Sequence, residues 1–285
     1  MTNKTDLAQK CSHLFSLPDI YLRLSRMLAD ENSTVDQIAE LVSLDAGLSA
    51  RLLKIANSSF YSFPAQIETI PRAITLIGCN ELCNLVLATS VAYSFVNISP
   101  DLLDMDSFWR HNVDTGLVMR RLGKTARVRD VERLFVVGLL HNVGKLMVLT
   151  YAPKDAAEIL EMPTKVEPWQ REQEVLGFTF AECGAELLKI WQLPETLVDA
   201  VQYQHQPQQA QIDPQGAALL HIASRAAGWM EQQTQDMEKI DYIQTIDPWA
   251  WEFTGLGLDD MDEAIDFAQV EAWGLLGLIT APLHK

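Results

Sequence analysis

The sequence contains little that would suit an oxidising or membrane environment. Its four cysteines, Cys11, Cys79, Cys83 and Cys183, form no Cys-x-x-Cys pair, so neither a disulfide framework nor a cysteine metal site is indicated. Cys79 and Cys83 are expected to be buried, reduced thiols. No apolar run approaches the roughly 18 residues that span a bilayer. The first ten residues contain no hydrophobic leader. We therefore expect a cytoplasmic protein that does not enter a membrane.

Positive charge is also scarce. The chain has 22 Lys and Arg against 38 Asp and Glu, a formal net charge of −16. Nonspecific nucleic-acid binding depends on neutralising phosphates with basic side chains, so this composition argues against nucleic acid as a partner. The acidic excess is concentrated at the C-terminal end, because residues 230–285 hold twelve acidic residues and two lysines.

One segment runs against this trend. Residues 110–133 hold seven basic side chains: Arg110, Arg120, Arg121, Lys124, Arg127, Arg129 and Arg133. Such a strip is commonly a solvated helix face. The alternative is that it docks an acidic surface, either the chain's own tail or a partner, or an anionic ligand near His111. Arg120 and Arg121 are the residues that we assign to such binding.

Sustained alternation of apolar and polar residues, which would indicate β-strands, is absent. Apolar residues instead recur at helical spacing over 35–56, 67–96, 107–125, 131–151, 181–192 and 194–205. Ser33 or Thr34 is available as an N-cap, and Pro194 suits a helix start. With 285 residues and 48% hydrophobic content, the chain can bury a large core. We expect an all-α protein with one main domain and an appendage.

The appendage, residues 229–285, combines acidic and aromatic residues. We expect residues 247–253 to form a short acidic loop with three aromatic side chains, and residues 261–279 to form an apolar helix. One interpretation is that this helix folds back on the body of the protein as a lid. The other is a protein interface anchored by Trp249, Trp251 or Trp273.

The most informative motif is His141-Asn142-Val143-Gly144-Lys145, which lies within an apolar stretch. An imidazole and an ammonium are costly to bury there without local partners. Residues 138–146 resemble the signature of the HD superfamily of metal-dependent phosphohydrolases, in which an adjacent His-Asp pair holds one or two metal ions. Here the Asp is an Asn. A neutral carboxamide offers one carbonyl oxygen and no charge, so it should hold hard divalent cations weakly.

Further motifs resemble one branch of that superfamily, the HDOD (HD-related output domain) family. They lie, in the order typical of that family, at residues 45–58, 70–78, 108–111, 174–188 and 191–194. The resemblance covers residues 14–228. It implies a multi-helix HD-domain-like bundle with an N-terminal helical half at 14–105 and an HD-like half at 106–228.

The resemblance also implies a set of metal-ligand positions. His111 stands at the first and His141 at the second, and Asn142 replaces the bridging Asp. Phe180 stands where a third His is common, Gln204-His205 where the family often has His-His, and Ser224 where catalytic members place a last Asp. Three imidazoles and no carboxylate remain. A binuclear hydrolase needs anionic ligands to hold two cations and activate water, so the matched positions cannot supply that centre.

Several alternatives stay open from the sequence. His111, His141 and His205 are either core histidines or a reduced site for a single divalent metal. Lys145 either faces a phosphate, as the resemblance implies, or extends to water. A carboxylate off the matched positions, Glu182, Glu186 or Asp199, would restore the site if it reached the cleft.

The resemblance implies a function in bacterial signalling, with partners in two-component or cyclic-nucleotide pathways. We predict a noncatalytic regulatory or adaptor module that needs no cofactor. The alternatives are a metal-dependent phosphohydrolase with a histidine-only site, in which Lys145 would contact phosphate, and a sensor that binds a nucleotide or small anion in the vestigial cleft.

Overall fold

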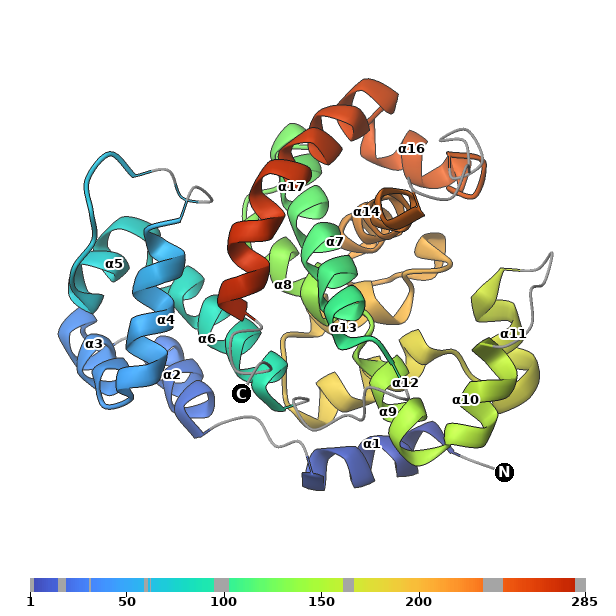
Figure 1. Cartoon of the computed structure of the whole chain (residues 1–285), viewed down its shortest axis with the longest axis horizontal. Coiled ribbons are helices and arrows are strands. Elements are labelled where there is room, and N and C mark those ends of the chain that lie inside the picture. The colour runs from blue at the N-terminus through green and yellow to red at the C-terminus, as the bar shows by residue number, and fades with distance from the viewer. Residues whose placement is uncertain are drawn as a thin grey trace. The chain divides into compact units, whose positions relative to one another are not determined.

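The structure is a computed structural model that describes residues 3–14, 19–30, 32–58, 61, 63–94, 103–160, 167–232 and 243–279. In these ranges every regular element is helical, which confirms the expected all-α class (Figure 1). The elements are α1 (Lys4–Leu14), α2 (Asp19–Ala29), α3 (Val35–Ser43), α4 (Ala46–Ala56), α5 (Ile70–Ile77), α6 (Cys79–Ser94), α7 (Met105–Thr125), α8 (Glu132–Leu140), α9 (Val143–Tyr151), α10 (Pro153–Leu160), α11 (Pro168–Leu176), α12 (Phe180–Ile190), α13 (Glu195–Gln202), the 3-10 turn η1 (Pro207–Gln209), α14 (Pro214–Gln232), α16 (Pro248–Thr254) and α17 (Leu258–Ile279).

Three of the expected long helices are broken for local reasons. Thr34 caps α3 through a capping box with Gln37, and Asp45 then caps a new helix by accepting from the Leu48 amide. The expected segment 67–96 divides at Gly78, whose φ of 91° is readily adopted only by glycine. The segment 131–151 divides at His141 and Asn142, so the polar pair lies at a helix junction.

The chain forms two compact units. The first comprises residues 1–16 and 97–268, and the second comprises residues 17–96 and 269–285. In the second unit α2 to α6 pack on one another, and Asn57 ties the loop after α4 to Ile67 by accepting from its amide and donating to its carbonyl, both at 2.7 Å. The functional motifs at His111 and His141 both lie in the first unit.

Helix α7 is the centre of the first unit and packs against both α8 and α14 (Figure 1). Two glycines set its distance from α8. A Cβ atom built on Gly138 would lie 2.4 Å from the Gly116 Cα atom, far inside van der Waals contact. The two backbones therefore touch, and this close approach places the end of α8 beside α7.

Helices α9 and α12 approach each other in the same way. A Cβ atom on Gly144 would lie within 1.9 Å of the Phe180 carbonyl oxygen. Helix α1 packs on α12 and α9, and Lys4 Nζ lies 3.1 Å from Glu182 Oε1. The glycine of the His141 motif is thus required for helix packing.

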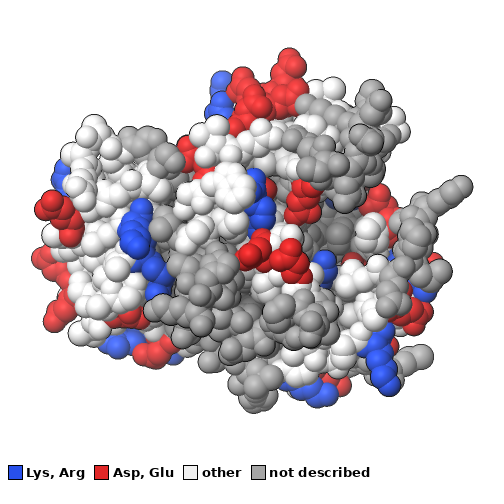
Figure 2. Space-filling model, viewed as in Figure 1, with Lys and Arg blue, Asp and Glu red and all other residues white. Residues whose placement is uncertain are grey.

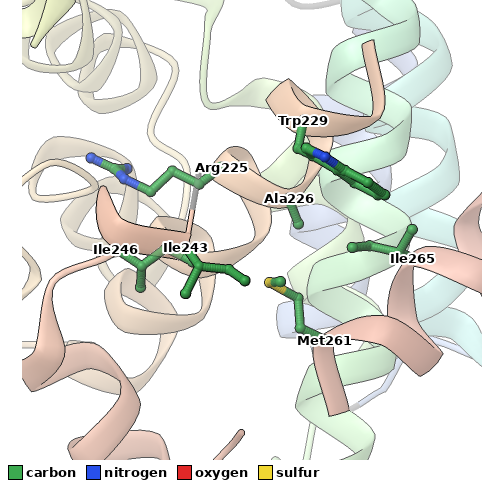
Figure 3. A pocket seen from close by; sticks show the side chains of 7 residues that line it. All are labelled: Arg225, Ala226, Trp229, Ile243, Ile246, Met261 and Ile265. Atoms are coloured by element: carbon green, nitrogen blue, oxygen red, sulfur yellow. The ribbon is translucent and has the colours of Figure 1, made fainter. Parts of the chain in front are cut away.

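Within the first unit, residues 243–265 of the appendage pack against α14. Ile243, Ile246, Met261 and Ile265 surround an apolar crevice together with Ala226 and Trp229, and the crevice is too narrow for water (Figure 3). Arg225 extends its guanidinium away from these side chains and donates through Nε to the Thr245 carbonyl at 2.9 Å. Helix α14 itself continues across residue 228, where the sequence suggested a boundary.

The expectation of a loop at 247–253 is wrong. Residues 248–254 form α16, because Asp247 accepts from the Trp249 amide at 2.9 Å and Pro248 occupies the first turn. Trp249 stacks on Phe253 within this helix, with ring centroids 4.5 Å apart. Helix α17 confirms the expected apolar helix and begins three residues before its expected start at 261.

One stretch of the described chain, Glu132–Tyr151, has the length and apolar composition of a membrane span, which the sequence reading did not anticipate. It corresponds to α8 and α9, and 78% of it is buried inside the structure. A bent pair, α5 with the first part of α6, meets the same test only when the two helices are counted together. Burial in the core accounts for the apolar character of α8 and α9.

We predict that Gly138→Ala lowers the free energy of unfolding by ~1–3 kcal/mol, because its methyl group must separate α7 from α8. Gly274→Ala is the matched control. Gly274 lies in α17 with nothing within 4 Å of an added Cβ, so its substitution should be neutral or stabilise by up to ~1 kcal/mol. Urea denaturation of both variants tests the assignment. Equal effects of the two substitutions would contradict it.

Candidate functional site

The junction between α8 and α9 faces α7. His141 caps the C-terminal end of α8, Asn142 precedes α9, and His111 lies on α7. The rings of His111 and His141 have centroids 5.3 Å apart and are tilted by 43°. The structure therefore brings together two imidazoles that are 30 residues apart in sequence, together with the carboxamide of Asn142.

His141 is buried and neutral. Its Nδ1 lies 2.5 Å from the Gly138 carbonyl oxygen, so Nδ1 carries the proton and donates. Burial, with a smaller contribution from His111, lowers the His141 pKa to about 3. The Nε2 lone pair is left unprotonated, and metal-bound histidines are held in the same way. His141 thus has the protonation state that a metal-binding histidine needs.

A chain of hydrogen bonds extends from His141 to the appendage. Gln204 Nε2 donates to the His141 carbonyl at 3.1 Å. The Gln204 carbonyl in turn accepts from His221 Nδ1 at 2.7 Å, and His221 Nε2 accepts the Asp247 backbone amide at 3.0 Å. These two bonds fix His221 as the neutral Nδ1-protonated form, and burial lowers its pKa to about 4. We call this path the His141–Asp247 chain.

The remaining matched positions do not fit a two-metal centre. Asn142 Nδ2 lies 3.5 Å from Asn112 Oδ1, so its amide group is directed toward a second carboxamide. Ser224 donates to the His221 carbonyl of its own helix at 3.3 Å. Neither position provides the anionic oxygen that two divalent cations need. In the ranges that the structure describes, no three His, Cys, Asp or Glu side chains form a metal-sized cluster.

His205 lies in a different setting. Its ring stacks on Trp169 with centroids 5.9 Å apart and planes 13° from parallel, and it lines a separate pocket. Burial, followed by the charge of Arg225, holds its pKa well below the usual value. His205 therefore does not share a pocket with His111.

A pocket of about 230 Å³ opens beside His111. His111, Asn142, Lys145 and Glu231 line it, with the start of α7 completing the wall. His111 Nδ1 lies 3.2 Å from Glu231 Oε1, a contact that becomes an ion pair when the imidazole is protonated. We call this the His111 pocket. It combines one ammonium group, one imidazole, one carboxamide and two carboxylates, those of Glu231 and of Asp104 at the start of α7.

Buried charges surround this pocket. Lys145 is half-buried, and burial lowers its pKa against the opposing attraction of Glu231 and Glu172. Asp114, one turn beyond His111, is buried beside Arg110, whose Nε lies 2.8 Å from Asp114 Oδ2, and burial raises the Asp114 pKa to about 6. Burial likewise raises the pKa of Glu172 to about 7. Lys145 thus extends into a pocket and not into bulk water.

The carboxylate near His111 was missed from the sequence. Glu231 lies seven residues after Ser224 on α14, on the same helix face. The carboxylates considered instead have other contacts. Glu182 pairs with Lys4, Glu186 pairs with Lys189 at 2.9 Å, and Asp199 accepts two backbone amides. The heptad spacing from Ser224 was the available signal.

The basic strip pairs largely with the chain's own acids. Arg120 contacts Glu132 and Arg133 contacts Asp213, while Arg121 Nη2 lies 2.7 Å from Glu263 Oε2 in α17. Figure 2 shows acidic side chains gathered at the top of the molecule in this view. The Arg121 contact matches the alternative in which the strip meets the chain's own acidic tail.

Two of the three tryptophans that we assigned as interface anchors lie in the first unit. Trp249 and Trp251 are half-buried in α16. Trp273 lies in the second unit, on α17, with 71% of its surface exposed. Their assignment as interface anchors stays a prediction.

The lowered pKa values of His221 and His141 predict that the core loses stability in acid. Neutral His221 and His141 contribute stability above the unfolded histidine pKa near ~6.5, and this contribution is lost as the pH falls toward their folded values of about 4 and about 3. Asp114 and Glu172, whose folded pKa values are raised, act in the opposite direction.

We therefore predict that the free energy of unfolding falls more steeply in the native protein than in His221→Gln between pH 6.5 and 4.5. The difference should approach ~1.4 kcal/mol per pH unit, because only the imidazole takes up the extra proton. Urea denaturation across this range measures it, and the carboxylate contributions cancel between the two proteins. Parallel curves would show that His221 is not held neutral.

Comparison with known proteins supports the family resemblance. The HDOD domain model matches residues 14–207. An uncharacterized protein of Treponema pallidum (strain Nichols) is 25% identical over 202 residues, which cover 70% of this chain and 39% of that protein. Bacillus subtilis YuxH is 34% identical over 71 residues, 25% of this chain and 16% of YuxH. The chain thus spans well under half of the curated relatives that it matches.

Solved structures share the fold over almost the whole chain. A protein from Shewanella amazonensis SB2B, named "Putative phosphohydrolase", is 27% identical with a TM-score of 0.75, covering 97% of each chain. An HDOD domain protein with unknown function from Geobacter sulfurreducens is 21% identical with a TM-score of 0.74, covering 97% of this chain and 98% of that one. Together with the match over residues 14–207, these similarities show that the chain belongs to the HDOD domain family.

Proposed function

We propose that this protein is a noncatalytic regulatory or adaptor module of bacterial signal transduction that acts in the cytoplasm. Its partners would be signalling proteins of two-component or cyclic-nucleotide pathways. One structural relative, from Marinobacter aquaeolei VT8, is named "Putative signal transduction protein"; it is 18% identical, with a TM-score of 0.65 over 97% of this chain and 66% of that one. This relative supports the fold, and its name motivates the proposed context.

The observation that carries the proposal is the replacement of the bridging carboxylate. Asn142 stands at that position, and its amide nitrogen lies 3.5 Å from Asn112 Oδ1. A carboxylate at this position would supply the negative charge that two divalent cations need, whereas the carboxamide is neutral and donates to Asn112. The site is thus built around a neutral hydrogen-bonding group, which suits a structural role better than the binding of cations.

The lack of a carboxylate at position 142 also ranks the phosphohydrolase alternative lower. His141 keeps a free Nε2 lone pair, but its neighbours supply an imidazole and a carboxamide, and Glu231 contacts His111. A hydrolase would need anionic ligands to lower the pKa of bound water. A single-metal enzyme would also require His205, which lines another pocket.

We predict that the protein hydrolyses neither phosphomonoesters nor cyclic dinucleotides when Mn²⁺, Ni²⁺ or Zn²⁺ is added. Rates for the native protein, His141→Ala and His111→Ala should be the same as the background rate. His111 is half-buried, so its variant serves if the core substitution prevents folding. Metal-dependent turnover that either variant abolishes would refute the proposal.

A specific observation also favours a small-anion sensor at the His111 pocket. Lys145 lines this pocket and forms no ion pair within the described ranges, and burial lowers its pKa although the nearby Glu231 and Glu172 carboxylates oppose that shift. An anion entering the pocket would gain the Lys145 ammonium and the Asn142 amide, and it would compete with Glu231 for His111. Such a ligand would favour the bound state of the protein and would not be converted to a product.

Inorganic phosphate tests this candidate. We predict that it raises the melting temperature of the native protein, since a ligand at ~100 times its Kd stabilises by ~2.7 kcal/mol. Lys145→Met should abolish the increase in melting temperature. Glu231→Gln should show the same increase at a lower phosphate concentration, because the competing carboxylate is removed. Lys189→Met, which removes a lysine paired with Glu186 outside the pocket, is the control. An unchanged shift in Lys145→Met would exclude the site.

A further inference from the structure

A second pocket, of about 100 Å³, lies around Trp169 and His205 and has no role in the proposed function. Its walls come from α11, the start of α12, and the turn after α13. The two aromatic rings lie 13° from parallel. We call this the Trp169 pocket. A stacked pair of aromatic rings presents an outer ring face on which another flat ring can stack.

Four glutamine side chains line this pocket. Gln173, Gln202, Gln206 and Gln209 line the pocket together with Tyr203. A primary amide presents a carbonyl acceptor beside two N–H donors, so it can pair with a ligand edge that carries both. Four glutamines around one aromatic surface therefore favour a ligand with alternating donors and acceptors.

The existing hydrogen bonds show which groups remain for a ligand. Gln173 already donates to a backbone carbonyl at 2.9 Å, which leaves its Oε1 as an acceptor. Gln206 accepts from Gln209 at 2.9 Å, and Gln202 accepts from Lys189 at 3.2 Å. The amide groups of Gln206 and Gln202 are thus left as donors. The pocket offers both kinds of partner.

Charge excludes an anionic group from this pocket. The acidic side chain in its wall is Glu182, which is paired with Lys4 at 3.1 Å and also accepts the Thr179 amide. His205 is neutral, since burial and the nearby Arg225 hold its pKa well below the usual value. Among the described residues that line the pocket, a phosphate would find a carboxylate and no unpaired cation. The ligand must therefore be uncharged where it enters.

We propose that the Trp169 pocket binds a nucleobase-class ligand, an uncharged planar heteroaromatic ring that stacks on the outer face of the Trp169–His205 pair and pairs along its edge with Gln173 and Gln206. The ring centroids are 5.9 Å apart. A base inserted between two rings needs about 7 Å, twice a van der Waals separation of ~3.5 Å. The base therefore stacks on the pocket side of the pair and does not separate the two rings.

Ligand-observed NMR and titration calorimetry on the full chain test the proposal, with adenosine, guanosine, cytidine and uridine as probes. We expect at least one nucleoside to bind saturably with one site per chain. Saturation transfer should be strongest at the base protons. Trp169→Leu should weaken binding about tenfold or more, because loss of a stacking partner costs that much in nucleobase recognition.

Matched variants separate this site from the His111 pocket. Gln206→Leu removes an edge contact without removing the aromatic surface, so it remains informative if Trp169→Leu fails to fold. Lys145→Met should leave nucleoside affinity unchanged, which makes the result independent of the anion-sensor candidate. The proposal is overturned if no nucleoside binds up to ~10 mM, the weak end of measurable affinity. It is also overturned if ribose protons receive the saturation, if inorganic phosphate competes, or if both pocket variants bind normally.

Discussion

The architecture of the HD-like half depends on keeping two buried imidazoles neutral. The His141–Asp247 chain joins the end of α8, the turn after α13, α14 and the start of α16, and each histidine in it donates from Nδ1 to a backbone carbonyl. His221 also accepts a backbone amide, which a protonated ring cannot do. Because these bonds are buried, losing one partner would leave a polar group unsatisfied at a cost of ~1–3 kcal/mol. Asp247, at the start of α16, is therefore part of the same hydrogen-bonded core.

The polar residues around His141 fall into two groups. His141, Gln204 and His221 are committed to backbone contacts, whereas His111, Lys145 and Glu231 face a pocket. The carboxylate in this pocket comes from Glu231, two helical turns beyond the matched Ser224, and it contacts an imidazole. Asn142 lines the same pocket and donates to Asn112. The region around His141 thus combines neutral hydrogen bonds with a polar pocket.

Helical periodicity was enough to predict the all-α class. The family motifs placed His111 and His141 in one site, and the structure brings their rings together. Periodicity and motifs could not give the rest, because it depends on contacts between distant segments. The spacing of His205 from His141 says nothing about whether it meets His111 or Trp169, and only the packed helices decide this. Residues 247–253 were predicted to be a loop because the prediction weighed their aromatic residues and overlooked Asp247 as an N-cap and Pro248 as the first residue of α16. Glu231 was missed because the length of α14 was not anticipated.

The metal content of untagged protein purified without chelator, measured by elemental mass spectrometry, tests the central claim most directly. A neutral site built from Asn142, His141 and His111 should carry divalent metal well below one equivalent per chain, because it lacks bridging carboxylates. His141→Ala should then leave the metal content unchanged. Close to one equivalent of Zn, Ni, Mn or Fe in the native protein, lost in His141→Ala, would contradict the account.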